Sequence, residues 1–118
     1  MLQLNHKKLE VWKQSLQLVK IVYQLTAKLP KEEQYNLVSQ MRRAAVSLSS
    51  NISEGASRRT ENERKRFYEI SRSSLVELDT QVEICLLLNY LTRDELQHLE
   101  LLSISIFKMM SKLAQRTD

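Results

Sequence analysis

Glycine, proline and cysteine each occur only once in the 118 residues of this chain, as Gly55, Pro30 and Cys85. Folds built from many short strands need turns rich in Gly and Pro, so this composition argues against them. Leu, Glu, Lys, Arg and Gln are abundant, and all of them favour helix. A single cysteine cannot form an internal disulfide and fits a reducing compartment. The sequence therefore predicts an all-α protein with a cytoplasmic location.

Long apolar runs are also missing. The longest strongly apolar run, 84–88, is far shorter than the roughly 20 residues that span a bilayer. The N-terminal segment MLQLNHKKLEVW lacks the apolar region of a signal peptide. A chain of this length is most simply one domain, here 1–118, with a substantial buried core. We therefore expect no membrane association.

Apolar side chains recur at helical spacing in four segments, at about 7–28, 32–54, 61–89 and 93–115. Asn5 is the expected N-cap of the first helix, and Gly55 is expected to end the second in the left-handed conformation. Thr60 and Thr92 each stand three positions before a glutamate, which is the pattern of a capping box. Short connections make neighbouring helices antiparallel, which predicts an up-down-up-down four-helix bundle.

The first predicted helix carries two apolar stripes. One consists of Leu9, Trp12, Leu16, Val19 and Tyr23, and the other of Val11, Leu18, Val22, Leu25 and Leu29. Either the core wraps widely around this helix, or one stripe contacts another subunit. The pattern alone leaves both interpretations open.

The second predicted helix has an apolar stripe bordered by a polar one. The apolar stripe comprises Leu37, Met41, Ala44, Ala45, Leu48 and Ile52, and the polar row comprises Gln40, Arg43, Ser47, Asn51 and Glu54. Half-buried polar groups need partners, and Glu77 on the third helix is the predicted partner of Arg43. The row either bonds to neighbouring helices and water or forms a binding or assembly surface.

A basic run follows Gly55. The candidate phosphate contacts are Arg58, Arg59, Arg64, Lys65 and Arg66, with Arg42 on the preceding helix. Residues 1–72 carry 14 basic and 7 acidic side chains, whereas 73–118 carry 4 and 7. Guanidinium groups pair well with phosphates, so the run predicts contact with RNA or another nucleic acid. The alternative is a solvated face with local ion pairs, because glutamates are interleaved with the basic residues.

Residues for catalysis or metal binding are poorly represented. His6 and His98 lack the paired-ligand spacing of metal sites in helical bundles. Cys85 lies in an apolar stripe, where a buried, inert thiol is expected. The serines of 47–57 have no recognisable base, and there is no Gly-rich phosphate loop. We expect no enzyme activity, no cofactor, no metal and no small-molecule substrate.

Four segments of this sequence carry a family resemblance: LEVW, QMRRAAVSLSSNISEG, RFYEISRSSLVELDTQVEI and NYLT. Together they resemble a bacterial four-helix-bundle family whose members include proteins encoded in intervening sequences of 23S rRNA genes. The resemblance implies an antiparallel four-helix bundle that forms a homo-oligomer, namely a pentamer. It implies no enzymatic activity, and RNA or DNA binding is a proposal for the family. A protein-interaction or assembly module without nucleic-acid binding is the alternative function.

The chain departs from the family pattern at a few positions. Ser49 stands where the family commonly has a proline, and Asn36 follows Tyr35 where a glycine is common. Serines, Ser71 and Ser73, stand where small residues are common in the third helix. Loss of the proline predicts a straighter second helix, because proline interrupts the helical hydrogen-bond ladder.

Overall fold

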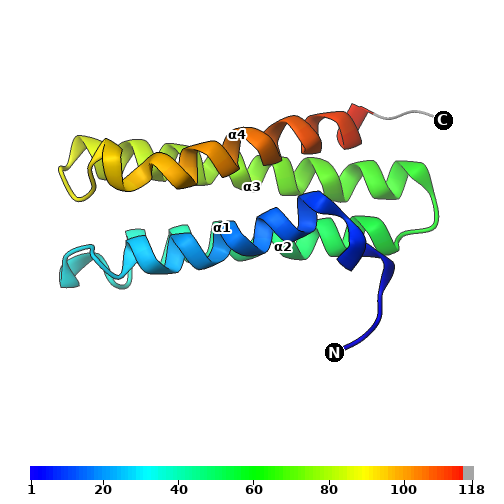
Figure 1. Ribbon diagram of the computed structural model, residues 1–118, viewed down its shortest axis with the longest axis horizontal. Coiled ribbons are helices and arrows are strands. Elements are labelled where there is room, and N and C mark those ends of the chain that lie inside the picture. The colour runs from blue at the N-terminus through cyan, green and yellow to red at the C-terminus, as the bar shows by residue number, and fades with distance from the viewer. Residues whose placement is uncertain (116–118) are drawn as a thin grey trace.

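The structure, a computed structural model, describes residues 1–115 and contains four α-helices in that range. They are α1 (Glu10–Thr26), α2 (Leu37–Ser57), α3 (Glu61–Leu87) and α4 (Arg93–Gln115), and the short 3₁₀ turns η1 (Asn5–Lys8) and η2 (Lys31–Glu33) precede α1 and α2. Each α-helix runs opposite to the one before it, and the pairs α1/α2 and α3/α4 form two layers (Figure 1). The predicted all-α four-helix bundle is confirmed. No helix within 1–115 is long and apolar enough to cross a membrane.

The core of the bundle follows the predicted apolar stripe of α2. All six of its members are buried, and four of them have no exposed surface, namely Met41, Ala45, Leu48 and Ile52. In α1 the stripe from Val11 to Leu29 is the buried one. The other stripe is only partly covered, since Leu16 and Tyr23 are each more than 40% exposed. α1 therefore carries more apolar surface than the monomer buries.

Thr60 and Thr92 both cap helices at the predicted positions, and the reciprocal bond of a capping box is present at Thr92. Thr60 Oγ1 accepts a hydrogen bond from the Glu63 backbone N–H at 3.2 Å, which opens α3. At the start of α4, the Glu95 N–H donates to Thr92 Oγ1 at 3.2 Å. The Thr92 N–H donates to Glu95 Oε1 at 2.9 Å, which completes the reciprocal pair.

Two predicted helix-end residues are wrong. Asn5 begins η1 instead of capping α1, whose N-cap is Leu9 without a side-chain bond. Gly55 has no positive φ and lies inside α2, which continues to Ser57. The left-handed residue is Asn89, with φ 59°, just after α3. The N–H groups of Asn89 and Tyr90 bond back to Leu86 and Cys85, which is the Schellman arrangement.

Gly55 serves close packing between α2 and α3. A Cβ at this position would lie 2.7 Å from Cε1 of the buried Tyr68 ring and 3.2 Å from Phe67 Cβ. Gly55→Ala gains about 1 kcal/mol of helix propensity but suffers about 1–3 kcal/mol of overpacking. We expect a net loss of about 1 kcal/mol in the free energy of unfolding, measured by urea denaturation. In a Tyr68→Leu background, the same Gly55→Ala change should stabilise; stabilisation in the wild-type background would contradict this account.

Lys28 and Glu95 join the end of α1 to the start of α4. Lys28 Nζ lies 3.0 Å from Glu95 Oε2, and this ammonium, with the Thr92 N–H, lowers the pKa of the Glu95 carboxyl. A lowered folded-state pKa contributes stability above the unfolded pKa of about 4.3, and that stability is lost as pH falls. Wild type should therefore exceed Glu95→Gln in stability at pH 7, and the difference should disappear near pH 3. Glu69→Gln, which removes an exposed carboxyl with no recorded partner within 1–115, should show no such pH dependence.

Candidate nucleic-acid interface

Residues 58–66 form the connection from α2 into α3 and are termed here the α2–α3 corner. Arg58 follows the last turn of α2 with extended backbone. Its Nη2 lies 2.9 Å from Glu54 Oε2, and its guanidinium carbon stands 4.8 Å from the centre of the Phe67 ring. Arg58 is thus held by a carboxylate on one side and an aromatic ring on the other.

Arg64 stabilises the backbone of the same corner. Its Nη1 donates to the carbonyl oxygens of Arg58 and Arg59, at 3.1 and 2.9 Å. These carbonyls belong to the segment between the two helices and have no helical partner of their own. Some of the N–H donors of Arg58 and Arg64 are therefore used within the protein, where they stabilise the conformation of the corner.

Three cationic side chains of the corner form no such bonds in the described part of the chain. Arg59 and Arg66 are exposed and Lys65 is half-buried. Within residues 1–115, no hydrogen bond or ion pair is recorded for any of them. A solvated guanidinium or ammonium on a fixed backbone is a suitable contact for a phosphate. The corner thus offers three available charges on a rigid support.

Arg42 lies away from the corner. Its Nε donates to Thr26 Oγ1 at 2.9 Å, its Nη2 donates to the Tyr23 carbonyl at 3.3 Å, and its guanidinium covers the Tyr23 ring at 4.4 Å. Sixteen positions separate it from Arg58 on α2, which is about 24 Å at 1.5 Å per residue. The six predicted phosphate contacts therefore do not form one cluster.

The predicted polar row of α2 bonds mainly within α2 and to residues at its ends, and Ser47 is the member that reaches another helix. Ser47 shares a hydrogen bond of 2.9 Å with Ser74 of α3, and Asn51 Nδ2 donates to the Ser47 carbonyl at 2.8 Å. Gln40 donates to Asn36 Oδ1 at 2.7 Å, just before α2. Glu54 at the far end pairs with Arg58, as described above.

The predicted Arg43–Glu77 ion pair is absent from residues 1–115. Glu77 Oε1 instead accepts a hydrogen bond from Gln81 Nε2 at 3.2 Å. Arg43 is exposed, so water solvates its charge and no carboxylate is needed. The sequence prediction assumed that the row was more buried at this position than it is.

Serine hydroxyls form contacts that the sequence analysis missed. Ser49 donates to Ser15 at 2.9 Å, in the buried contact between α1 and α2. The Trp12 indole N–H donates to Ser53 at 3.1 Å, and the Ser71 hydroxyl donates to the Leu48 carbonyl. The serine at the family's proline position thus bonds to α1, and α2 runs through it without interruption. The signal in the sequence that indicates such contacts is the recurrence of small polar residues at helical spacing.

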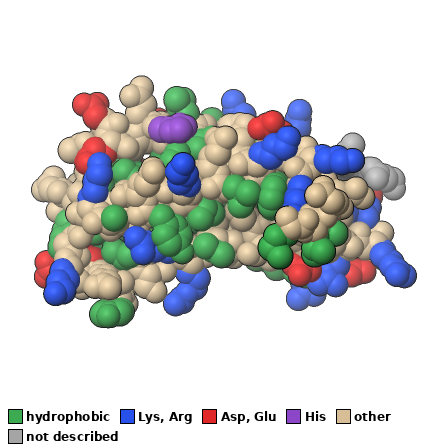
Figure 2. All heavy atoms as spheres, turned by 60° about the horizontal axis from the view of Figure 1, so that its bottom comes forward, with side chains coloured by type: hydrophobic (Ala, Val, Ile, Leu, Met, Phe, Trp, Pro, Cys, Tyr) green, Lys and Arg blue, Asp and Glu red, His purple; other side chains and the backbone are tan. Residues whose placement is uncertain are grey.

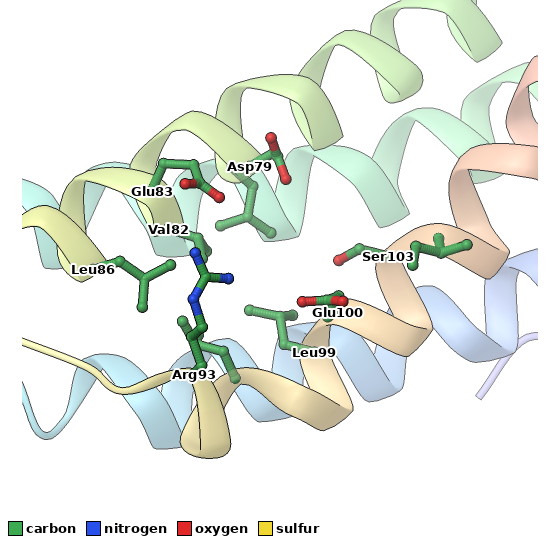
Figure 3. A pocket seen from close by; sticks show the side chains of 11 residues that line it. Asp79, Val82, Glu83, Leu86, Arg93, Leu99, Glu100 and Ser103 are labelled. Atoms are coloured by element: carbon green, nitrogen blue, oxygen red, sulfur yellow. The ribbon is translucent and has the colours of Figure 1, made fainter.

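A small hollow of about 100 Å³ lies between α3 and α4. Figure 3 shows Arg93 reaching from the start of α4 toward Asp79 and Glu83 on α3, with Glu100 and Ser103 on α4 nearby. Among the described residues, no group of three His, Cys, Asp or Glu side chains is placed to hold a metal ion. The hollow has charged walls but no evident reaction chemistry.

Cys85 is buried in the core, with its Sγ 3.7 Å from Met41 Sδ. Burial raises the pKa of the thiol, and the Glu33 carboxylate raises it further. Only the thiolate is a good nucleophile, so this cysteine is a packing residue.

Comparisons with known proteins agree with this architecture. The family model described as 23S rRNA-intervening sequence protein matches residues 7–112. The chain belongs to this family. The family description names no enzymatic reaction. Comparison with curated proteins gave no match.

The family assignment is accompanied by a similar solved structure. This is a crystal structure of a protein of unknown function from the S23 ribosomal protein family of Bacteroides thetaiotaomicron VPI-5482. The two sequences are 19% identical. The match covers 90% of this chain and 99% of the Bacteroides chain, with a TM-score of 0.82. At this identity the likeness establishes the fold and leaves the function to be argued from the surface.

Proposed function

We propose that this member of the 23S rRNA-intervening sequence protein family is a non-enzymatic homo-oligomer that binds nucleic acid, preferentially structured RNA, through the α2–α3 corner. The observation that carries the proposal is the set of three available cations, Arg59, Lys65 and Arg66, on a backbone fixed by Arg58 and Arg64. Repetition of the corner in an oligomer would raise the affinity of a weak patch through avidity. Cys85, a free thiol, is consistent with a cytoplasmic location.

Self-association is supported by apolar surface on the outer side of α3 and α4. Val76, Ile104 and Phe107 are 51%, 48% and 38% exposed and line a groove of about 370 Å³. Asp79 and Lys108 line the same groove. The segment 73–107 as a whole carries one basic and six acidic residues, whereas 7–28 carries five basic and one acidic. We propose that the part of the exposed α1 stripe around Leu16 in one copy packs on this apolar face of the next copy.

Such a contact joins two different surfaces, so it is heterologous and forms a ring when the rotation closes. A pentamer, the state that the family resemblance implies, is the proposed ring. Leu16 would supply its main apolar contact from α1, because the monomer leaves this side chain partly uncovered. Lys13 and Lys20, on the same helix, would face the acidic segment of the neighbouring copy.

The test is the mass of the particle in solution, with and without a structured RNA, at low and high salt. The subunit mass is 13.9 kDa, and the proposal predicts a multiple of it at both salt concentrations. The RNA should add its mass at low salt and dissociate at high salt, because phosphate contacts release counterions. A monomer, or an RNA complex insensitive to salt, would contradict the proposal.

A second candidate function is an assembly module without nucleic-acid binding. It is favoured by the engagement of Arg42, Arg58 and Arg64 within the fold, where each bonds to carbonyl, hydroxyl or carboxylate oxygens. The same mass measurement separates the two functions. An oligomer that acquires no RNA even at low salt would support the second candidate.

A further inference from the structure

A second basic surface lies on the outer side of the first half of α2. It is a groove of about 600 Å³ whose lining comes from the segment before α2, from α2 itself and from Tyr23 of α1. No aspartate or glutamate lines it. Figure 2 shows the α1/α2 side of the bundle, where Lys and Arg side chains are spread around apolar ones. The α2–α3 corner, by contrast, has glutamates interleaved with its basic residues.

Aromatic rings are available in this groove. Tyr35 is 90% exposed, so its ring contributes little to the packing of the bundle. Tyr23 is 43% exposed and has one side covered by the Arg42 guanidinium at 4.4 Å. An exposed ring beside cations is the combination on which unpaired bases stack.

Two guanidinium groups flank the rings. Arg42 is fixed by its bonds to Thr26 and Tyr23. Arg43 is exposed, and no hydrogen bond or ion pair is recorded for it within 1–115. The groove thus pairs one preoriented cation with one that is free to bind a phosphate.

We infer that this groove is a subsite for unpaired nucleotides of a bound RNA, in which Tyr35 stacks on a base and Arg43 binds the adjoining phosphate. This inference rests on the proposed nucleic-acid binding. It adds a second binding site on the protein and predicts that this site prefers single-stranded segments of the RNA. Sixteen positions separate Arg43 from Arg59 at the corner. At the helical rise of about 1.5 Å per residue, this separation corresponds to about 24 Å. At about 3.4 Å per stacked nucleotide, roughly seven nucleotides reach from one site to the other.

The surface between the two sites accommodates such a strand. Ser50 and Ser57 lie on the same side of α2 as Val46 of the groove at helical spacing, and both are exposed. Their side chains are small and uncharged. Glu54, the carboxylate in the same row as Arg43, is paired with Arg58 at 2.9 Å, and this pairing reduces its repulsion of a phosphate backbone. The outer side of α2 thus connects the groove to the α2–α3 corner.

The test uses a labelled RNA hairpin with a single-stranded tail of about ten uridines, and the same hairpin with an abasic tail. Binding to the full protein is followed by fluorescence anisotropy. Tyr35→Leu keeps an apolar side chain without the ring and should weaken binding of the uridine tail roughly 5- to 150-fold, the range for one lost base stack. Tyr35→Phe should retain wild-type affinity, and Tyr35→Leu should bind the abasic tail as wild type does. Leu87→Ser, at a position that is 78% exposed, is the control for loss of exposed apolar surface and should change nothing.

Arg43→Gln should weaken binding of both tails, because it removes a phosphate contact and leaves the ring in place. The inference is overturned if Tyr35→Leu and Arg43→Gln bind the uridine tail like wild type while a variant neutralised at the corner is weakened; the proposed function then stands alone. It is also overturned if Tyr35→Leu alters the mass of the protein without RNA, since the groove would then be a subunit contact. Failure of the wild type to bind any of these RNAs would overturn both proposals.

Discussion

Replacing Leu48 with alanine should lower the free energy of unfolding by about 3 kcal/mol. Leu48 lies near the middle of α2, has no exposed surface, and its carbonyl accepts the Ser71 hydroxyl of α3. Removing the side chain loses its transfer free energy and leaves a cavity between tightly packed helices, for which about 2–5 kcal/mol is typical. The loss should appear as a lower urea midpoint with an unchanged slope.

Val46→Ala is the matched control for Leu48→Ala. Val46 lies two positions earlier on the same helix and is 42% exposed. Its substitution should change the free energy of unfolding by less than about 0.5 kcal/mol. Equal effects at the two positions would mean that α2 does not turn its predicted apolar stripe to the core.

Neutralising the available cations of the α2–α3 corner, in the variant Arg59→Gln, Lys65→Gln and Arg66→Gln, should weaken RNA binding about 100-fold at 0.1 M salt. Each phosphate contact contributes about 0.7–0.9 to the slope of log affinity against log salt, so three contacts contribute about two decades between 0.1 M and 1 M. None of the three side chains has a recorded bond within 1–115, so the stability of the bundle should be nearly unchanged.

The control is a second triple variant with the same net charge, in which three cationic residues outside the α2–α3 corner are replaced. Lys31, Arg93 and Lys112 lie in η2 and α4, are all exposed, and are changed to glutamine together. If RNA binding depended only on net charge, both triple variants would weaken it equally. We expect the control to retain most of the wild-type affinity.

The predicted features that the structure confirms depend on local patterns. Helix caps at Thr60 and Thr92 involve residues three positions apart, and the stripe of α2 follows from the helical period. Such signals need no knowledge of neighbouring helices. They were sufficient to predict four helices and the buried side of α2.

The features that sequence reasoning missed depend on contacts between distant segments. The sequence pattern predicts a helix end at Gly55, whereas the close approach of Tyr68 from α3 explains why this position has no side chain. Arg42 was grouped with the corner by charge, but Tyr23, nineteen positions earlier, holds it at another site. Arg43 was expected to need a carboxylate, and its exposure makes one unnecessary. Pairing and exposure of this kind appear only when the helices are packed.

The proposed phosphate-binding role of the α2–α3 corner is tested most directly by the salt dependence of RNA binding. Log affinity is measured against log salt for the wild type and for the variant neutralised at Arg59, Lys65 and Arg66. The slope for the wild type should be steeper by about 2 to 3, which corresponds to three lost phosphate contacts. Identical slopes for the two proteins would show that the corner does not bind phosphates and would contradict the proposed function.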